Sequence, residues 1–306
     1  MNIFSSSQSQ LLWRRLCAYQ PAVYSAALLL ILTILVLSAP LIELGLGLDA
    51  NKVDLFNRYL SPSIINPLGT DELGRDLFIR LLYGGRTSLI VGVVAGLFAT
   101  FLGISIGLSA GYFGGYCDAF LMRLTDSVIS LPLLPLLIVL AAIDLTKLGF
   151  PETIAQSQGS SFYRIVIIVG LFSWTTVARL VRAGTLSLKE QSFIEAAEAQ
   201  GAGSFRIMFV HILPNLASPV IVATTLAVGN IILLESVLSF LGLGIQPPMP
   251  SWGNLLSNAQ ALIWESPMAA FYPGLLIFFT VVSLNFLGDG LQYALNTRSR
   301  IDPYRR

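Results

Sequence analysis

Few side chains of this sequence could carry out chemistry. Of 306 residues only 17 are Asp or Glu, and the single histidine is His211. One histidine cannot build a His-rich metal site or the His-Glu-x-x-His motif of zinc hydrolases. The phosphate-binding motif G-x-x-x-x-G-K-[ST] is also missing from the sequence. We therefore expect that the chain itself is not an enzyme and holds no metal or cofactor of its own.

Two polar residues stand in apolar surroundings. Glu235 and Asn230 lie inside the apolar stretch at 217–242. Ionisable residues within a membrane helix are costly, and they mark functional sites or contacts between helices. Both residues are therefore candidates for a solute path, in which Glu235 would contact a charged terminus of the cargo. The alternative for Glu235, a hydrogen bond between helices, is the interpretation that we prefer.

Composition places these residues in a membrane protein. Hydrophobic residues make up 55% and charged residues 11% of the sequence, whereas soluble domains carry about 25% charged residues. A helix needs about 20 mostly apolar residues to cross the hydrocarbon core. The stretches that qualify lie at 22–42, 87–111, 119–143, 163–183, 217–242 and 269–291. Because backbone groups in lipid must pair within their own segment, we expect an all-α integral membrane protein with six transmembrane helices.

The distribution of basic residues predicts the orientation. Arginines precede the first stretch and follow the last one, and Lys189 and Arg206 lie in the segment at 185–216. Lys and Arg are enriched in cytoplasmic loops, so both termini and this segment are expected in the cytoplasm. The loop at 243–268 has no Lys or Arg, and the long loop at 43–86 carries charges of both signs. We expect both of these loops outside.

Glycines and prolines predict details within the stretches. Pro132 and Pro135 each remove a backbone donor and should kink the third stretch. Small residues spaced by four let two helices approach closely in lipid, and packing within the bundle is preferred here over a subunit interface. The glycines that show this spacing are Gly92, Gly96, Gly103, Gly107 and Gly111.

The 185–216 segment is the longest cytoplasmic connection, and it is not a flexible linker. Ser192 and Glu195 have the spacing of a capping box, and helix-forming residues follow. Gly201 interrupts this helix, an apolar helical segment resumes after it, and Pro214 ends the segment. The sequence therefore predicts two short helices, joined by a glycine turn, at the inner face of the membrane. By charge alone they would be an ordinary amphipathic interfacial hairpin.

One pattern in this segment is similar to a known family. It consists of Glu195-Ala196-Ala197, then Gly201, then His211-Ile212-Leu213-Pro214. The pattern resembles the EAA loop of permease subunits in ATP-binding-cassette importers. The general pattern has an apolar residue where this chain has its histidine. The form His-x-Leu-Pro-Asn is similar to that of the dipeptide, oligopeptide and nickel subfamily.

The segments at 69–76 and 235–253 also resemble the C-type permeases of that subfamily, so the resemblance covers nearly the whole chain. It implies a type I importer permease fold in which the EAA loop docks on a cytoplasmic ATPase. Glu195 would offer charge to the ATPase, the two alanines would allow close approach, and His211 would be a polar anchor rather than a pH sensor. The residues assigned to ATPase coupling in this way are Glu195, Ala196, Ala197, Gly201, His211, Leu213 and Pro214.

The resemblance also implies partners and an organisation of the chain. The partners would be a second, distinct permease of the B type, an external solute-binding protein and two cytoplasmic ATPases that hold ATP and magnesium. ATP binding would rock the two permeases between inward-facing and outward-facing states. The chain would comprise a first helix and external loop at 1–86, a five-helix core at 87–298 that includes the coupling loop, and a cytoplasmic tail at 299–306. Its expected location is the bacterial cytoplasmic membrane.

An alternative function comes from another class of protein. An ATP-independent secondary transporter or channel would show broken helices, inverted repeats or several charges near the midplane, and Glu235 alone is little support for it. A membrane-embedded hydrolase is disfavoured because paired catalytic residues are lacking. The solute stays open among dipeptides, oligopeptides, nickel chelates and related small solutes.

Overall fold

A computed structural model describes residues 6–149, 151–155, 157, 159–257 and 266–295, and within these residues the chain is helical and forms no strand. The α-helices before residue 150 are α1 (Ser6–Ala18), α2 (Gln20–Leu37), α3 (Ala39–Leu46), α4 (Leu77–Phe113), α5 (Gly115–Ser130) and α6 (Leu133–Ala142). Those after it are α7 (Glu152–Ala155), α8 (Ser160–Phe172), α9 (Thr175–Lys189), α10 (Ser192–Ala199), α11 (Ser204–Arg206), α12 (Leu213–Phe240), α13 (Trp252–Leu255) and α15 (Pro267–Leu295). Short 3₁₀ turns cover Leu55–Asn57 and Leu145–Leu148, and a π-helical turn covers Ile207–Ile212.

Helices that could cross a membrane make up most of the described chain. The segments that are long and apolar enough are Gln20–Leu37, Leu77–Phe113, Ser160–Lys189, Ser204–Phe240 and Pro267–Leu295. They correspond to five of the six stretches expected from the sequence. The remaining stretch, at 119–143, forms α5 and α6, which are bent by 85° relative to each other. This pair is either one broken span or a re-entrant loop, so the described chain has five or six candidate spans.

The break between α5 and α6 follows from proline chemistry. Leu131 precedes Pro132 and adopts an extended conformation, with φ −78° and ψ 137°, as expected because a proline disfavours the α region for the residue before it. Pro132 then stands at the N-cap of α6. Pro135 lies in the first turn of α6, where a missing N–H is tolerated. The expected kink is therefore confirmed, and it occurs at Pro132.

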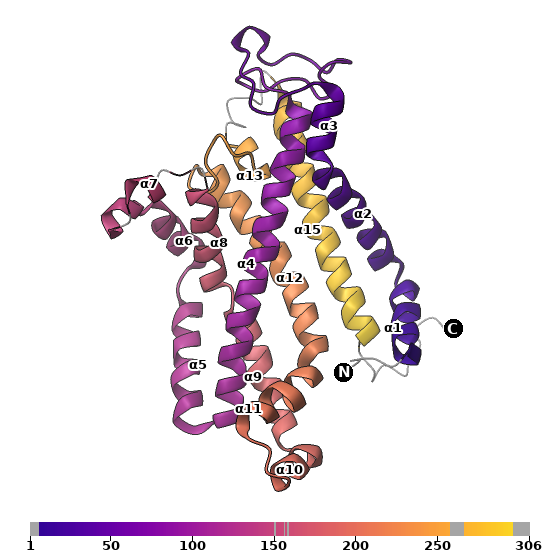
Figure 1. Cartoon of the computed structure of the whole chain (residues 1–306), viewed down its shortest axis with the longest axis vertical. Helices are drawn as coiled ribbons and strands as arrows, with labels where there is room; N and C mark the ends of the chain where they lie inside the picture. Colours follow the sequence, from indigo (N-terminus) through magenta and orange to yellow (C-terminus); the bar gives the residue numbers. More distant parts are fainter. Residues whose placement is uncertain (1–5, 150, 156, 158, 258–265, 296–306) are drawn as a thin grey trace.

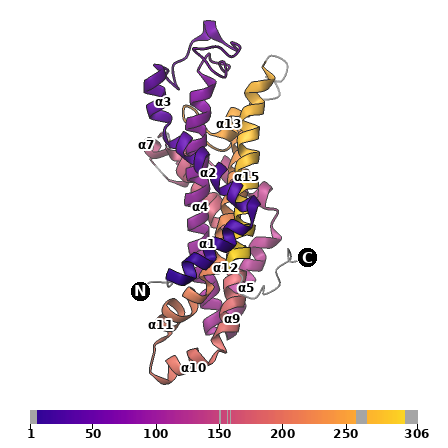
Figure 2. The ribbon, with the colours of Figure 1, turned by 90° about the vertical axis from the view of Figure 1, so that its right-hand side faces the viewer.

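Helix α4 runs along the length of the molecule beside α9 and α12 (Figures 1 and 2). Its row of glycines makes this close packing possible. A Cβ atom at Gly103 would lie 2.7 Å from the Cβ atom of Val177 on α9, and one at Gly92 would lie 2.5 Å from Cγ1 of Ile232 on α12. Any side chain at these positions would push the helices apart. The preferred interpretation, packing within the bundle, is confirmed.

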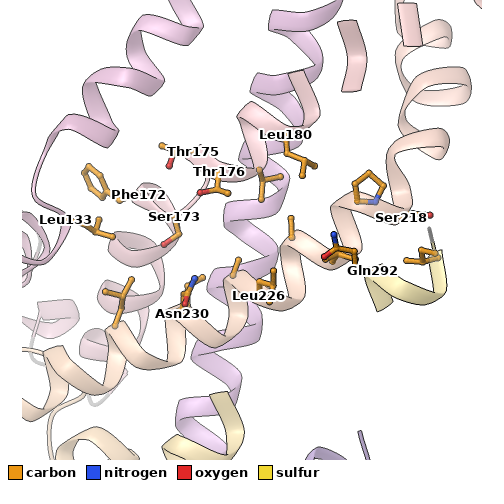
Figure 3. Close-up of a pocket in the computed structure, with 18 residues that line it drawn as sticks. Leu133, Phe172, Ser173, Thr175, Thr176, Leu180, Ser218, Leu226, Asn230 and Gln292 are labelled. Carbon is orange, nitrogen blue, oxygen red and sulfur yellow. The ribbon is translucent and has the colours of Figure 1, made fainter. Parts of the chain in front are cut away.

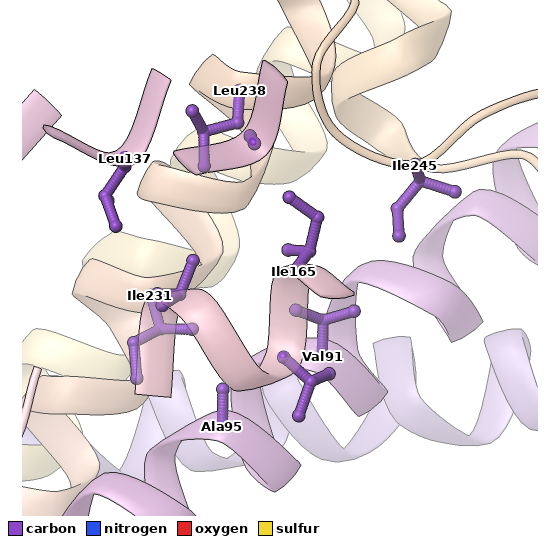
Figure 4. Packing of buried hydrophobic residues seen from close by; sticks show 10 residues of the cluster. Val91, Ala95, Leu137, Ile165, Ile231, Leu238 and Ile245 are labelled. Carbon is purple, nitrogen blue, oxygen red and sulfur yellow. The ribbon is translucent and has the colours of Figure 1, made fainter. Parts of the chain in front are cut away.

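A buried apolar cluster joins four of these helices (Figure 4). Val91 and Ala95 come from α4, Leu137 from α6, Ile165 from α8 and Ile231 from α12, and all are fully or almost fully buried. Their contacts hold the bent α5–α6 pair against the straight helices, because α6 contributes directly to the cluster.

The two ends of the molecule carry different elements. Helix α10 lies at one end, and α1 and the last turns of α15 lie toward the same end (Figure 1). Helices α3 and α13 lie toward the opposite end, together with the segment at 48–76 (Figures 1 and 2). Helix α12 connects the two ends: its first turns lie near α11, and its last turns lie near α13.

Candidate coupling and transport sites

Helix α10 ends in a glycine turn, as the sequence predicts. Gly201 has φ +82°, in the left-handed region that a side chain disfavours. Its N–H donates to the carbonyl of Glu198 at 2.8 Å, and the N–H of Ala202 donates to the carbonyl of Ala197 at 3.0 Å. These two bonds form a Schellman motif, which satisfies the last carbonyls of the helix. The turn therefore has a defined geometry and is not a flexible joint.

The start of α10 differs from the expectation. Gln191 is the N-cap residue, with an extended backbone and no side-chain capping bond, and Ser192 is the first residue of the helix. The predicted capping box between Ser192 and Glu195 is therefore wrong, because a capping box needs its serine at the N-cap position. Glu195 instead lies in the first turn, where a carboxylate is favoured by the positive end of the helix.

The two faces of α10 have different roles. Ile194 and Ala197 are buried on the face toward the π-helical turn Ile207–Ile212, and Ile194 belongs to an apolar cluster that includes Met208. Glu195 and Ala196 are exposed on the other face. Of the two alanines considered for contact with an ATPase, the structure thus presents Ala196 and turns Ala197 toward the chain's own core.

The second half of the coupling segment continues directly into α12. The backbone is helical without a break from Ser204 to Phe240, and Pro214 lies in the first turn of α12. The expectation that Pro214 ends the segment is therefore wrong, because the helix runs from the π-helical turn into α12 across this proline. The π-helical turn Ile207–Ile212 precedes it, and the N–H of Leu213 donates to the carbonyl of Met208.

His211 and Leu213 lie at this junction. The side chain of His211 is half-buried, and its backbone carbonyl accepts a hydrogen bond from the side-chain amide of Asn215 at 2.6 Å. Leu213 packs against the apolar cluster that also contains Ile194 and Met208. Leu213 therefore takes part in the packing between α10 and α12, and the bond to Asn215 ties the backbone at His211 to the start of α12.

A cavity of about 720 Å³ lies between α12, the junction of α8 and α9, and the last turns of α15 (Figure 3). Asn230, Thr176 and Gln292 are among its polar lining residues, and apolar residues such as Leu226 and Phe172 line the rest. No charged residue of the described chain lines it. Such a cavity can hold a small solute through neutral hydrogen-bonding groups on an apolar wall.

Glu235 lies elsewhere. Its side chain is fully buried, with an exposed fraction of 0%, and it does not line the cavity. One carboxyl oxygen accepts a hydrogen bond from Ser88 on α4 at 3.0 Å, and the other accepts one from Ser239 at 2.7 Å. The bond to Ser88 joins two helices, as in the interpretation that we preferred. The structure therefore does not bring Glu235 and Asn230 to one site.

Two ion pairs between α5 and α9 were not deduced from the sequence. Arg182 donates to both carboxyl oxygens of Asp118, and Arg179 forms an ion pair with Asp126. The partners are separated by more than fifty positions in the sequence, so no local spacing signals them. They tie α5 to α9 in the half of the molecule that carries α10 (Figure 1).

Helix α4 also contains two Gly-x-Ser-x-Gly sequences, centred on Ser105 and Ser109. In serine hydrolases this motif forms a sharp turn between a strand and a helix and exposes the nucleophile. Here both serines lie within a continuous helix, and their hydroxyls donate to the carbonyls of Phe101 and Ser105. The glycines of these motifs pack on α9, so the motifs serve helix packing.

Comparisons with known proteins agree with this arrangement. A family model described as "Binding-protein-dependent transport system inner membrane component" matches residues 103–301. A putative peptide permease protein of Brucella suis biovar 1 (strain 1330) is 37% identical over 283 residues, which cover 92% of this chain and 88% of the relative. The glutathione transport system permease protein GsiD of Shigella flexneri serotype 5b (strain 8401) is 40% identical over 287 residues, which cover 94% of this chain and 89% of the relative.

These matches define the class of protein. The chain belongs to the family of binding-protein-dependent transport system inner membrane components, the permease subunits of ATP-binding-cassette importers. It is a multi-pass protein of the bacterial inner membrane, and it is a permease subunit rather than a catalytic enzyme. Membership of this family implies that an ATPase and a solute-binding protein are its partners.

Proposed function

We propose that this chain is the C-type permease subunit of an importer for dipeptides, oligopeptides or related small peptides, and that it couples ATP hydrolysis on partner subunits to alternating access. The names of the relatives, a peptide permease and a glutathione permease, support a peptide-like solute. The single observation that carries the coupling role is the fixed connection from the exposed face of α10 through the π-helical turn to α12, which lines the cavity.

The proposed topology has six spans, with both termini in the cytoplasm and α5 and α6 forming one broken span. Two observations support it. Arginines flank the first and last apolar stretches, Lys189 and Arg206 lie in the 185–216 segment, and the loop at 243–268 has no Lys or Arg, as the enrichment of Lys and Arg in cytoplasmic loops predicts. Helix α1 and the last turns of α15 also lie toward the end of the molecule that carries α10 (Figure 1).

In the proposed mechanism α10 docks in a groove on a cytoplasmic ATPase. Glu195 and Ala196 lie on its exposed face, and Ile194 and Ala197 tie its other face to the cluster at the start of α12. The Schellman turn at Gly201 keeps the two halves of the segment at a fixed angle. A displacement of the ATPase would therefore move α12 and the cavity as a rigid body. ATP and magnesium would be bound by the ATPases.

The proposed assembly contains two permeases, two ATPases and one solute-binding protein on the side of α13. The cavity would form half of a solute path that a distinct B-type permease completes. Its neutral lining suits solutes that carry both charges, because Asn230, Thr176 and Gln292 can bond to peptide groups without selecting a net charge.

The experiment that tests this proposal is solute uptake by the complete complex in proteoliposomes with ATP inside and solute-binding protein outside. We expect Glu195→Lys to abolish most ATP-driven uptake, because it reverses a charge on the exposed face of α10, while the complex still inserts in the membrane. The matched control is Glu152→Lys, an equally exposed change on α7, far from α10 (Figure 1). Wild-type uptake by the Glu195→Lys complex would refute the coupling role.

A second candidate function is favoured by one observation. The break of 85° between α5 and α6 is the kind of discontinuous helix on which secondary transporters build their binding sites. Solute flux through the purified chain in liposomes without ATP would support that function. It would also reduce the segment around α10 to an interfacial hairpin.

A further inference from the structure

Glu235 is a buried carboxyl group that neither the cavity nor the proposed coupling uses. It lies near the end of α12, beyond Asn230 by about one and a half helical turns. We infer that Glu235 is a positioning residue that fixes the segment at 241–252, and with it α13, onto α4 and α12. The inference depends on the proposed function only in assigning this segment to the side of the permease that receives the solute.

Two hydroxyl groups connect Glu235 to the segment. The hydroxyl of Ser88 donates to Glu235 Oε2 at 3.0 Å and accepts the backbone N–H of Trp252 at 3.2 Å. The hydroxyl of Ser239 donates to Glu235 Oε1 at 2.7 Å and accepts the backbone N–H of Ile245 at 3.0 Å. Two positions of the 241–252 segment, Ile245 and its last residue Trp252, are thus bonded, through one serine each, to a single carboxyl group.

The chemistry of these bonds explains why a carboxyl group stands at this position. A serine hydroxyl has one proton, and once its oxygen accepts a backbone N–H, that proton needs an acceptor. A carboxyl group has two oxygens, and each of them accepts from one serine here, so one side chain orients both hydroxyls toward the segment. All five groups are in buried surroundings, where an unpaired donor or acceptor is costly.

The segment fits closely around this anchor. A Cβ atom at Gly253 would lie 2.6 Å from the Cα atom of Ser236, and one at Gly244 would lie 2.1 Å from the hydroxyl oxygen of Ser239. The indole of Trp252 is fully buried, and its Nε1–H donates to the carbonyl of Leu81 on α4 at 3.0 Å. The segment is therefore placed on the helices by close contact and specific bonds, and Glu235 orients the two serines that accept the N–H groups of Ile245 and Trp252.

The consequence for transport concerns how α12 moves. Glu235 is on α12 and Ser88 is on α4, so their bond fixes one helix against the other next to the segment. While the bonds of Glu235 are intact, a displacement of α12 moves the 241–252 segment with it. Without the bonds of Glu235, α12 can move while the 241–252 segment stays in place or loses its hydrogen bonds. The side of the permease that receives the solute then no longer moves together with the ATPases.

The test is hydrogen–deuterium exchange of the complete complex in lipid nanodiscs, compared between wild type, Glu235→Gln and Glu235→Ala. Removal of the acceptor should raise exchange at the amides of Ile245 and Trp252 about tenfold in Glu235→Ala, as expected when a buried hydrogen bond is lost. Glu235→Gln should give a smaller increase, because its one carbonyl oxygen can still serve one of the two serines. Exchange over 192–212 should stay unchanged.

The control is Thr280→Val on α15, which removes an equally buried hydroxyl that has no hydrogen-bond partner among the described residues. It should leave exchange at Ile245 and Trp252 unchanged. Unchanged exchange at these amides in Glu235→Ala would overturn the inference, and so would an equal loss of protection in the segment around α10. If the complex with Glu235→Ala does not assemble, the exchange of the same two amides in Glu235→Gln is the test, and unchanged exchange there would overturn the inference.

Uptake measurements on the same complexes test the transport consequence separately. We expect Glu235→Ala to lower ATP-driven uptake at least fivefold while ATP hydrolysis without solute-binding protein stays at the wild-type rate. Wild-type uptake combined with raised exchange would overturn the role in transport. Because the exchange measurement needs no ATP and no solute, its result stands even if the importer function itself is refuted.

Discussion

The two ends of α12 are held in different ways. At the end near α10 the contacts are apolar: Ile194, Met208 and Ile212 pack together, and Phe205 and Phe209 stack on an exposed face. At the other end a buried carboxyl group, two serines and two backbone amides form directional bonds. Apolar contacts are non-directional, whereas hydrogen bonds weaken steeply when their geometry changes. At the first end, which we call the adaptable end, apolar side chains can therefore repack against a partner while the backbone connection from α10 to α12 is kept. The second end, which we call the fixed end, also keeps the geometry of its side chains.

The largest effect is expected from a substitution that breaks the fixed end. Gly253→Val places a side chain where the Cα atom of Ser236 is only 2.6 Å from the Cβ position. We expect a loss of about 3 kcal/mol in the free energy of unfolding, because overpacking against backbone forces the segment away from α12. Thermal unfolding of the purified complex in detergent measures it. Gly274→Val on α15 is the control, since a Cβ atom there meets nothing within 4 Å, and an equal loss in both variants would contradict the close fit.

A smaller loss of stability is expected at the adaptable end. Gly201→Val should cost about 1–2 kcal/mol, the strain of a left-handed conformation for a residue with a side chain. The space around Gly201 is open, so the cost is conformational and not steric. Gly203→Ala is the matched control, because its φ is −70° and its surroundings are equally open. The ratio of uptake to ATP hydrolysis should fall in Gly201→Val and stay unchanged in Gly203→Ala. An equal ratio in the two variants would show that the turn at Gly201 has no role in coupling.

The exposed aromatic pair should affect binding more than stability. Phe205→Ala should change the free energy of unfolding by less than about 0.5 kcal/mol, as is usual for an exposed side chain. We expect it to weaken co-purification of the ATPase, because Phe205 and Phe209 present an apolar face next to α10, with ring centroids 6.3 Å apart. The control is Phe101→Ala, which removes a similarly exposed phenylalanine from α4. Unchanged co-purification would assign the aromatic pair to contact with lipid.

The smallest effect is a pH dependence at the fixed end. Asp76 caps α4 by accepting the N–H of Ile79 at 2.8 Å, and burial raises the pKa of its carboxyl group above 3.8. A raised pKa means that the wild type loses stability relative to Asp76→Asn as the pH rises from below 3.8 through the pKa of the folded chain. Asparagine keeps the capping acceptor without the charge. Unfolding measured between about pH 4 and pH 7 should show this trend, and a constant difference between the two proteins would contradict it.

Local patterns in the sequence predict backbone features set by single residues better than contacts between distant residues. The glycine turn at Gly201 and the kink at Pro132 follow from the backbone chemistry of single residues. The bond between Glu235 and Ser88 joins residues 147 positions apart, and no periodicity in a single sequence indicates such a pair. The same holds for the direction of Ala197, which depends on how α10 packs against the π-helical turn.

The errors have physical reasons of the same kind. The capping box was expected at Ser192 because the motif has the right spacing, but the helix starts at Ser192 itself and Gln191 takes the N-cap position. The end expected at Pro214 did not allow for a helix that runs across a proline, as it does here from the π-helical turn into α12. Both cases concern helix boundaries, which the packing of neighbouring elements shifts by a residue or more.

The π-helical turn Ile207–Ile212 has a consequence for how such permeases can diverge. A turn of this type holds one residue more than an α-helical turn. Deletion of one residue there would restore a regular α-helix and leave α10 on nearly the same side of α12, because the π-helical turn takes up its extra residue within the turn. The residues of α12 that line the cavity would keep their faces. A single-codon deletion at this turn would thus shorten the coupling segment and leave both the exposed face of α10 and the solute path close to where they were.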